Sequence, residues 1–207
     1  MTITTGIPTL DLAQFSQGAD RAAFVQALGA AYEDIGFVAV KNHGLDEALQ
    51  NRLYAAVQAF FALPDDVKMK YDGSFVAGQR GYTPRDREHA KGRNVGDLKE
   101  FYHVGQTFAP GDPLAAGYPQ NIWPEEIADF KAVTLEAYRR LEDAGRQMLR
   151  AIALYLGLDE TYFDDKIRGG DSILRPIHYY PIDDPASMPP DAVRSAEHED
   201  INLITLL

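Results

Sequence analysis

The alternation of apolar and polar residues predicts strands and a helix in the first part of the chain. Residues 7–12 (IPTLDL) alternate as in a short extended segment. Residues 36–44 (GFVAVKNHG) have the Phe and Val content and the Gly boundaries of a strand. Between them, residues 19–34 read as a helix, because apolar side chains recur every four positions along one face: Phe24, Leu28 and Tyr32.

Two further helices are predicted next along the chain. The first begins at Asp46 and stops at Pro64, which a helix interior does not accommodate. Its apolar face is formed by Leu49, Leu53, Val57, Phe60 and Phe61. The second is the short segment PDDVKMKY, which Pro64 opens. Asp65 and Asp66 lie in its first turn, where the helix dipole favours negative charge.

A Gly- and Pro-rich middle, residues 73–120, separates these elements from a long helix. We expect loops there, with two short strands around GYTP and KEFYHVG. Pro124 then opens a helix that Gly157 ends, with one apolar stripe along its length. At about 1.5 Å per residue it would be more than about 40 Å long. A helix of that length with a single apolar stripe is expected to lie against a sheet.

Strand patterns come late in the chain, in residues 172–180 (SILRPIHYY) and 200–207 (DINLITLL). Early helices and late strands are typical of the α+β class, and the sheet has only begun when residue 207 is reached. An apolar strand that ended there would present unpaired backbone groups at an open edge. We therefore expect these 207 residues to be part of a longer chain.

Composition narrows the classes of function. Apolar residues make up 45% of the chain and charged residues 25%, as in an ordinary globular protein. The 31 Asp and Glu against 20 Lys and Arg give a formal charge of −11, which disfavours nucleic acid and anionic membranes as partners. No apolar run approaches the roughly 20 residues of a membrane span, and the N-terminus lacks a signal-peptide pattern. The chain has no cysteine, which excludes disulfides, thiolate metal sites and a cysteine nucleophile, and we expect a cytoplasmic protein.

The triplet HED at residues 198–200 is the strongest candidate for chemistry. On a strand, His198 and Asp200 point to one face and Glu199 to the other. One imidazole and one carboxylate on one face are two of the three ligands of the 2-His-1-carboxylate site of non-heme Fe(II) enzymes. The same two residues also fit an exposed polar patch at the end of a strand. A buried pair, in contrast, would require a metal or each other.

Ordered motifs across nearly the whole chain resemble one enzyme family. They are IPTLDL, GFVAVKNHGL, FFALPDDVKMKY, RGYTP, DLKEFYHVG, LRPIHYYP and HEDINLITLL. With these motifs the chain resembles the isopenicillin N synthase-like family of 2-oxoglutarate- and Fe(II)-dependent oxygenases. The resemblance implies a double-stranded β-helix (jelly-roll) core, incomplete in this chain. It also implies an N-terminal helical and strand region in residues 1–120, and the long helix with the first barrel strands in residues 121–207.

By this resemblance, His198 and Asp200 are two iron ligands, and the third ligand, a distal His, lies after Leu207. The Arg-x-Ser pair that holds the far carboxylate of 2-oxoglutarate also lies beyond this chain. No catalytic residue is implied outside the metal site. The other histidines are not expected to replace the distal ligand: His43, His89, His103 and His178.

The resemblance also implies a Tyr that contacts 2-oxoglutarate, on the strand that contains LRPIHYYP. Counting four residues from Arg175 gives Tyr179, which we prefer because this count needs no gap. Counting back from Pro181 gives Tyr180, and a β-bulge would favour it. Both tyrosines also fit a packing role in the barrel.

The implied reaction is oxidation of a small organic substrate with O2 at Fe(II), with 2-oxoglutarate as cosubstrate and succinate and CO2 as products. Substrate contacts are expected from residues 75–105, where one cation and three aromatic rings are candidates for either contact or packing: Arg80, Tyr82, Phe101 and Tyr102. Two alternatives remain. One is an Fe(II) oxidase of the same family that does not use 2-oxoglutarate, and the other is a non-catalytic, truncated module. The sequence does not indicate an oligomeric state.

Overall fold

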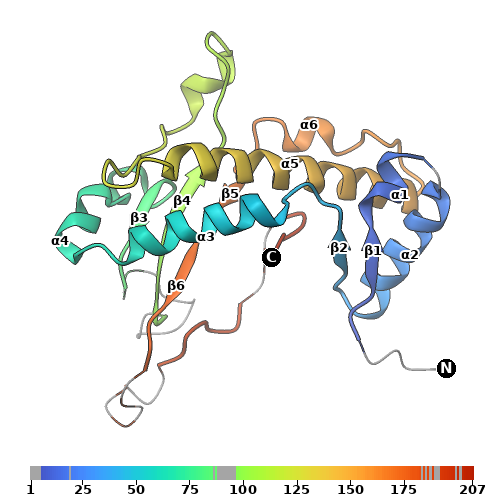
Figure 1. The fold of residues 1–207 in the computed structure, drawn as a ribbon. Helices are drawn as coiled ribbons and strands as arrows, with labels where there is room; N and C mark the ends of the chain where they lie inside the picture. The colour runs from blue at the N-terminus through green and yellow to red at the C-terminus, as the bar shows by residue number, and fades with distance from the viewer. Residues whose placement is uncertain are drawn as a thin grey trace. The chain divides into compact units, whose positions relative to one another are not determined.

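The computed structural model describes the chain in the following ranges: 6–18, 20–85, 87, 97–182, 184, 186, 188, 192–198, 200 and 202–207. Its contacts divide the chain into two compact units. Unit 1 consists of Met1–Gln50, Arg139–Gly170 and Ile204–Leu207, and unit 2 consists of Asn51–Tyr138 and Asp171–Leu203. Each unit combines helices with strands (Figure 1), so the predicted α+β class is confirmed. The expected division at residue 120 stays a prediction.

Unit 1 begins with two short parallel strands, β1 (Thr9–Asp11) and β2 (Ala39–Lys41), with Thr9 opposite Ala39. Both lie inside the predicted extended segments and are shorter than predicted. A helix that the sequence did not predict, α1 (Leu12–Ser16), follows β1 directly. Asp11 explains it, because its Oδ1 accepts a hydrogen bond from the backbone N–H of Ala13 at 3.0 Å and caps the helix.

The core of unit 1 lies between α1, α2 (Arg21–Asp34) and the second part of α5 (Phe130–Tyr155). It is formed by Leu12, Phe15, Phe24, Val25, Leu28, Ala144, Met148 and Ala151. The four-residue spacing of Phe24 and Leu28 therefore identified the buried face of α2 correctly. Beyond α5, the short helix α6 (Asp164–Ile167) is tied to it by an ion pair of 2.5 Å between Arg150 and Asp164.

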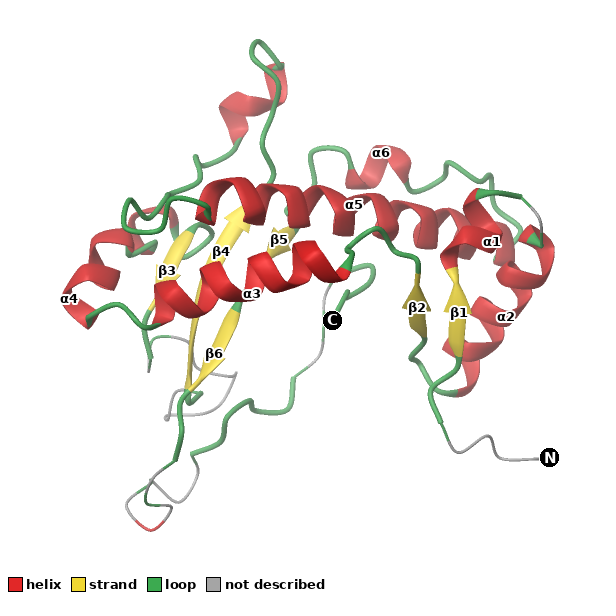
Figure 2. Cartoon of the chain, in the orientation of Figure 1, coloured by secondary structure: helices red, strands yellow, loops and turns green. Residues whose placement is uncertain are grey.

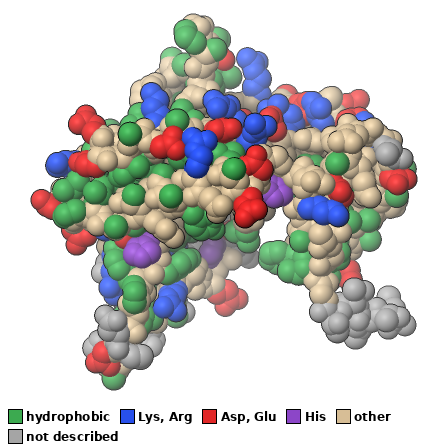
Figure 3. Space-filling view, viewed as in Figure 1, with side chains coloured by type: hydrophobic (Ala, Val, Ile, Leu, Met, Phe, Trp, Pro, Cys, Tyr) green, Lys and Arg blue, Asp and Glu red, His purple; other side chains and the backbone are tan. Residues whose placement is uncertain are grey.

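The helix α3 (Glu47–Phe61) starts where the sequence predicted, because Oδ1 of Asp46 accepts the backbone N–H of Leu49 at 2.8 Å. After Pro64 follow α4 (Asp65–Lys68) and a 3-10 turn, Met69–Tyr71. Further 3-10 turns are Ser74–Val76 and Pro113–Gly117. In Figure 3, acidic and basic side chains are interspersed over the surface of the long helices. One such group joins α3 to the start of α5, with Arg52 Nη2 3.1 Å from Asp129 Oδ1.

Unit 2 contains an antiparallel sheet, drawn in yellow in Figure 2. Its strands are β3 (Gly81–Thr83), β4 (Lys99–Gly105), β5 (Ile173–Leu174) and β6 (Ile177–Tyr179). The strands predicted at GYTP, KEFYHVG and 172–180 are thus present. The last of them is interrupted at Pro176, which has no N–H to donate to a neighbouring strand.

The two faces of this sheet have different neighbours. Tyr102 on β4 packs against the helices: its ring centroid lies 4.8 Å from Phe60 of α3 and 5.0 Å from Phe130 of α5. The predicted packing of the long helix against a sheet is therefore present in unit 2. Side chains alternate along a strand, so the neighbouring residues point away from the helices. We call this second side the helix-distal face, formed by Lys99, Phe101, His103, Arg175, Ile177 and Tyr179.

The predicted start of the long helix is wrong, although its end is correct. The helix begins at Phe130, not at Pro124. The Tyr71 hydroxyl accepts the backbone N–H of Glu125 at 3.0 Å and donates to the Glu126 carboxylate at 2.6 Å, which holds these residues outside the helix. With 26 residues the helix is about 39 Å long. Gly157 ends it at a φ of 71°, a conformation that favours glycine.

The predicted strand at 200–207 is absent among its described residues, Asp200 and 202–207. A strand requires a neighbour for its backbone groups, and this segment pairs with none of the described strands. None of the helices in the described ranges has the length and apolar character that a bilayer crossing requires.

Candidate functional site

His198 and Asp200 lie close together, although not on a strand. Nε2 of His198 is 3.6 Å from Oδ1 of Asp200. Two donors that each lie about 2.1 Å from one metal ion are about 3 Å apart when adjacent and about 4.2 Å apart when opposite. The observed 3.6 Å is about 0.6 Å longer than the adjacent arrangement that a facial 2-His-1-carboxylate site requires. One metal ion could therefore contact both atoms after a small adjustment.

The His198 ring is held in the orientation that a metal ligand requires. Its Nδ1 lies 2.8 Å from the carbonyl oxygen of Ala196. A carbonyl only accepts, so Nδ1 carries the hydrogen and Nε2 presents its lone pair on the side of Asp200. Metal-ligating histidines usually donate their second N–H to a carbonyl or a carboxylate in this way. At 3.6 Å the imidazole and the carboxylate do not hydrogen-bond each other.

The segment before His198 is fastened to the start of β4. The backbone N–H of Leu98 donates to the carbonyl of Val193 at 3.0 Å. The N–H of Ala196 donates to Oδ1 of Asp97 at 3.2 Å. Both ends of the 193–196 segment are thereby held beside the sheet.

The helix-distal face contains a hydrogen-bonded pair that the sequence did not reveal. Nε of Arg175 lies 2.6 Å from Nε2 of His103, and Nδ1 of His103 lies 2.6 Å from the carbonyl oxygen of Gly78. The Arg175 guanidinium also lies over the Phe101 ring, 4.7 Å from its centroid. The ladders on either side place Arg175 opposite His103, so only the strand register could have indicated the pair.

The two candidate tyrosines have different surroundings. Tyr179 lies opposite Lys99 on the helix-distal face, on the same side as Arg175, and is 39% exposed. Tyr180 follows the strand, and burial together with a hydrogen bond to the Glu100 carboxylate raises its pKa. Which of them contacts 2-oxoglutarate stays a prediction.

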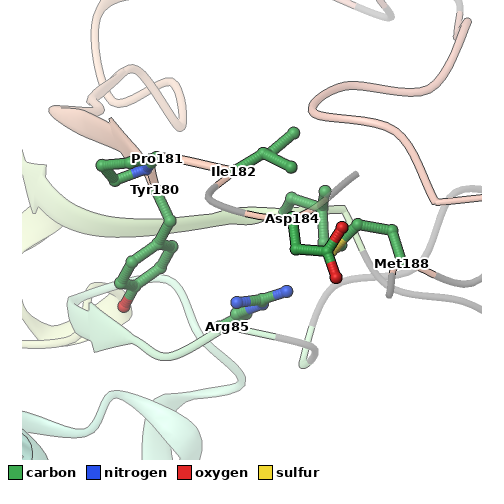
Figure 4. A pocket seen from close by; sticks show the side chains of 7 residues that line it. Arg85, Tyr180, Pro181, Ile182, Asp184 and Met188 are labelled. Atoms are coloured by element: carbon green, nitrogen blue, oxygen red, sulfur yellow. The ribbon is translucent and has the colours of Figure 1, made fainter. Parts of the chain in front are cut away.

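Tyr180 also lines a small cavity of about 210 Å³ (Figure 4). The other lining residues are Arg85, Leu98, Pro181, Ile182, Asp184 and Met188. The Arg85 guanidinium lies 5.5 Å from the centre of the Tyr180 ring. Pockets for organic ligands usually measure about 300–1,000 Å³. The cavity is therefore smaller than the usual pocket for an organic ligand and does not form a substrate site by itself.

Two of the four predicted substrate residues, Tyr82 and Tyr102, lie on the helix-packed side of the sheet, against Phe60 of α3. Tyr102 is fully buried and its hydroxyl donates to the carbonyl of Ile122 at 2.7 Å. The guanidinium of Arg80 is buried against Gly105, and this burial lowers the pKa of Arg80. Tyr82 donates to Glu100 at 2.5 Å. These contacts favour packing roles for Arg80, Tyr82 and Tyr102, whereas Phe101 lies on the helix-distal face beside the Arg175 guanidinium.

Glu100 is the centre of a buried polar network on the helix-packed side. Its carboxylate accepts hydrogen bonds from Lys68 Nζ at 2.8 Å, the Tyr82 hydroxyl at 2.5 Å and His178 Nδ1 at 2.7 Å. Burial raises the pKa of Glu100, but these hydrogen bonds and one from Tyr180 outweigh burial and hold the pKa below its ordinary value. His178 is thereby engaged in the network, where its ring stacks on Phe61.

The remaining predicted positions are placed as follows. His43 accepts the backbone N–H of Leu45 through Nδ1 at 3.3 Å, within a turn. His89 and Glu199 lie outside the described residues. Within the described ranges, no group of three or more His, Asp and Glu side chains is arranged to hold a metal ion. His198 and Asp200 lie close together in the described part of the chain, and their role as metal ligands stays a prediction.

Comparison with known proteins finds relatives along nearly the whole chain. The family described as "non-haem dioxygenase in morphine synthesis N-terminal" matches residues 7–126. The 2-oxoglutarate-Fe(II) type oxidoreductase hxnY of Emericella nidulans is 29% identical over 219 residues, which cover 98% of this chain and 60% of that protein. The proline hydroxylase buaE of Petromyces alliaceus is 33% identical over 192 residues, covering 89% of this chain and 58% of that protein.

Solved structures are also similar to this chain over most of its length. A 2OG-Fe(II) oxygenase family protein from Caulobacter crescentus superimposes with a TM-score of 0.75 at 38% identity, covering 86% of this chain and 58% of that chain. A full-length protein of Neurospora crassa, solved in complex with alpha-KG and thymine, gives a TM-score of 0.76 at 26% identity, covering 96% of this chain and 64% of that chain. The chain therefore spans about three fifths of the length of the relatives it matches.

Proposed function

This chain belongs to the isopenicillin N synthase-like family of 2-oxoglutarate- and Fe(II)-dependent oxygenases, and from that premise we propose that it is part of an enzyme that oxidises a small organic substrate with O2. The observation that carries the proposal is the His198–Asp200 pair. Nε2 of His198 lies 3.6 Å from Oδ1 of Asp200, and Nδ1 of His198 is hydrogen-bonded to the Ala196 carbonyl. The barrel is proposed to be a jelly roll, of which this chain holds the first strands.

His198 and Asp200 fit Fe(II) because they offer one neutral nitrogen and one anionic oxygen, the donor types of the 2-His-1-carboxylate site. The third ligand is predicted to be a His after Leu207. When bound with 2-oxoglutarate, the metal supplies the oxidising chemistry, in which O2 is consumed, succinate and CO2 are released, and the substrate is hydroxylated, desaturated or cyclised.

The protein's own contribution is binding and orientation. We assign the 2-oxoglutarate contact to Tyr179, with Tyr180 as the alternative, because Tyr179 shares the helix-distal face with Arg175. On this face Phe101 offers a ring and Arg175 a guanidinium whose position His103 fixes. The substrate is proposed to lie against this face, since the helices α3 and α5 occupy the other one. The cytoplasm remains the predicted location.

Metal binding tests the site directly. In the full-length protein, we expect His198→Ala and Asp200→Asn each to weaken Fe(II) binding strongly, because the first removes the nitrogen donor and the second the negative charge of the oxygen donor. Glu199→Gln is the matched control, since the neighbouring carboxylate is not an expected ligand. A His198→Ala variant that binds Fe(II) as tightly as the wild type would refute the assignment.

Turnover distinguishes the alternatives. Succinate release is measured with a panel of small substrates. The panel includes proline and thymine, because one relative is named a proline hydroxylase and one similar structure was solved with thymine. Succinate formed only with both 2-oxoglutarate and a substrate supports the proposed oxygenase. Substrate oxidation without 2-oxoglutarate would identify the oxidase alternative. A protein that binds no Fe(II) and oxidises nothing would be the non-catalytic module.

A further inference from the structure

We propose that Asp97 is a positioning residue, which holds the His198 imidazole in the tautomer that presents Nε2 to a metal. That His198 is a metal ligand rests on the proposed function. The hydrogen bonds that connect Asp97 to His198 lie within this chain and do not depend on it. Asp97 and His198 are distant in sequence and are joined through a single residue, Ala196.

The Asp97 carboxylate is fixed through both of its oxygens. It is 6% exposed and is separated from β4 by Leu98 alone. Oδ2 pairs with Lys99 Nζ at 2.9 Å, and the side chains of both residues are almost fully buried. Oδ1 accepts the backbone N–H of Ala196 at 3.2 Å. The contact with Ala196 therefore needs only the Oδ1 acceptor, whereas the Lys99 ammonium neutralises the buried charge through Oδ2.

Ala196 connects the Asp97 carboxylate to the histidine. It is 3% exposed, its N–H is bound to Asp97, and its carbonyl oxygen lies 2.8 Å from His198 Nδ1. The second connection, from the Leu98 N–H to the Val193 carbonyl, restrains the same segment at its other end. The Ala196 carbonyl therefore keeps a fixed direction.

A fixed carbonyl selects one form of the imidazole. A neutral histidine carries its proton on either nitrogen, and the hydrogen bond made by one nitrogen decides the state of the other. Because the Ala196 oxygen accepts only from an N–H, it favours the proton on Nδ1. Nε2 is then unprotonated and close to Asp200, as a metal ligand must be.

The competing explanation is that Asp97 serves only as the partner of Lys99. Three variants separate the two roles. Asp97→Asn keeps an oxygen acceptor for the Ala196 N–H and loses the charge, whereas Asp97→Ala loses both. Lys99→Met is the matched control, because it removes the ion pair and leaves the Asp97 acceptor.

The readout is the tautomer of His198 in the metal-free, full-length protein, measured by NMR with nitrogen-15-labelled histidine. The spectrum of His198→Gln identifies the relevant signal, because only the His198 signal is missing from it. All spectra are recorded in one buffer at about pH 8, so that the variants are compared under the same conditions. We expect the Nδ1–H form in the wild type, Asp97→Asn and Lys99→Met, and loss of this preference in Asp97→Ala. An unchanged tautomer in Asp97→Ala, or equal loss in Lys99→Met, overturns the proposal.

Two further measurements complete the test. Mn(II) binding should weaken about tenfold in Asp97→Ala, at the lower end of the 10–100-fold effect typical of residues that orient a metal ligand. Unchanged Mn(II) affinity overturns the proposed purpose. In the wild type, the Ala196 amide should exchange with solvent much more slowly than that of exposed Ser195, a test that does not depend on a variant folding. Equal exchange rates overturn the proposal. Failure of Fe(II) binding with an intact tautomer preference would instead count against the proposed function.

Discussion

Arg175 donates a hydrogen bond from Nε to Nε2 of His103 on the neighbouring strand, with 2.6 Å between the two nitrogens. The second ring nitrogen of His103 donates to the carbonyl oxygen of Gly78, which leaves Nε2 as the acceptor. The guanidinium is further held over the Phe101 ring. A cation is thereby fixed in one orientation on the helix-distal face.

The coupling of these two side chains can be measured. We expect His103→Leu and Arg175→Ala each to lower the free energy of unfolding by about 1–2 kcal/mol, because each removes a hydrogen bond to a charged group. Arg175→Ala also loses a cation–π contact, which contributes about 0.5–1 kcal/mol at exposed sites. In urea unfolding, the double variant should lose about 1 kcal/mol less than the sum of the single losses.

Arg139→Ala is the control for this experiment, since Arg139 is an exposed arginine on α5. Its unfolding free energy should stay within about 0.5 kcal/mol of the wild type. Strictly additive effects of His103→Leu and Arg175→Ala would show that the two side chains are not coupled.

A second prediction concerns the buried pair Lys68 and Glu100. The Glu100 carboxylate is fully buried and Lys68 is 2% exposed, with 2.8 Å between Nζ and Oε2. Glu100→Gln leaves the ammonium with Asp65, whose side chain is 90% exposed, as its remaining carboxylate. We expect a loss of about 3 kcal/mol in the free energy of unfolding, the lower end of the cost of breaking a buried pair.

Two controls accompany this experiment. One is the reciprocal variant, Lys68→Met, and the other is the double variant that combines Lys68→Met with Glu100→Gln. If the cost of Glu100→Gln arises from an isolated ammonium, Lys68→Met should recover part of it in the double variant. Urea unfolding of the four proteins gives the coupling energy. A double variant that loses the full sum of both single effects would contradict this account.

The same carboxylate should make stability depend on acid pH. The pKa of Glu100 is held below its ordinary value in the folded chain, so the unfolded chain takes up the proton first as the pH falls. Its stabilisation is therefore fully present above about pH 4.3, the ordinary Glu value, and is lost as the pH falls through the folded pKa. Between about pH 6 and pH 3, the wild type should lose more unfolding free energy than Glu100→Gln. Parallel curves for the two proteins would refute the prediction.

The predictable part of the fold was encoded locally. The apolar spacing of α2 and the Asp46 cap of α3 are visible within one segment, and the structure confirms both. The start of α5 was not predictable in this way. Glu125 and Glu126 resemble the first turn of a helix in the sequence, but the hydroxyl of the distant Tyr71 binds them outside it.

The candidate site shows the same limit. The spacing of His198 and Asp200 was enough to predict that they lie close together, and their atoms are 3.6 Å apart. The strand that was expected to bring them together is absent among the described residues, because no described strand pairs with this segment. The state of the His198 ring depends on Asp97 through Ala196, a contact between distant segments that no local pattern indicates.

The last prediction concerns Gly29 of α2, which lies against the ring of Tyr155 at the end of α5 in unit 1. A Cβ added at Gly29 would overlap the Tyr155 ring, so Gly29→Ala must displace it. Ala normally stabilises a helix interior by about 1 kcal/mol relative to Gly, whereas overpacking of this kind costs about 1–3 kcal/mol. We expect a net loss of up to about 2 kcal/mol in urea unfolding, and the loss should disappear when Gly29→Ala is made in a Tyr155→Ala background, because the ring is then absent. Gly117→Ala is the control, because an added Cβ there meets nothing within 4 Å. A Gly29→Ala variant as stable as the wild type would contradict the close packing of α2 against the end of α5.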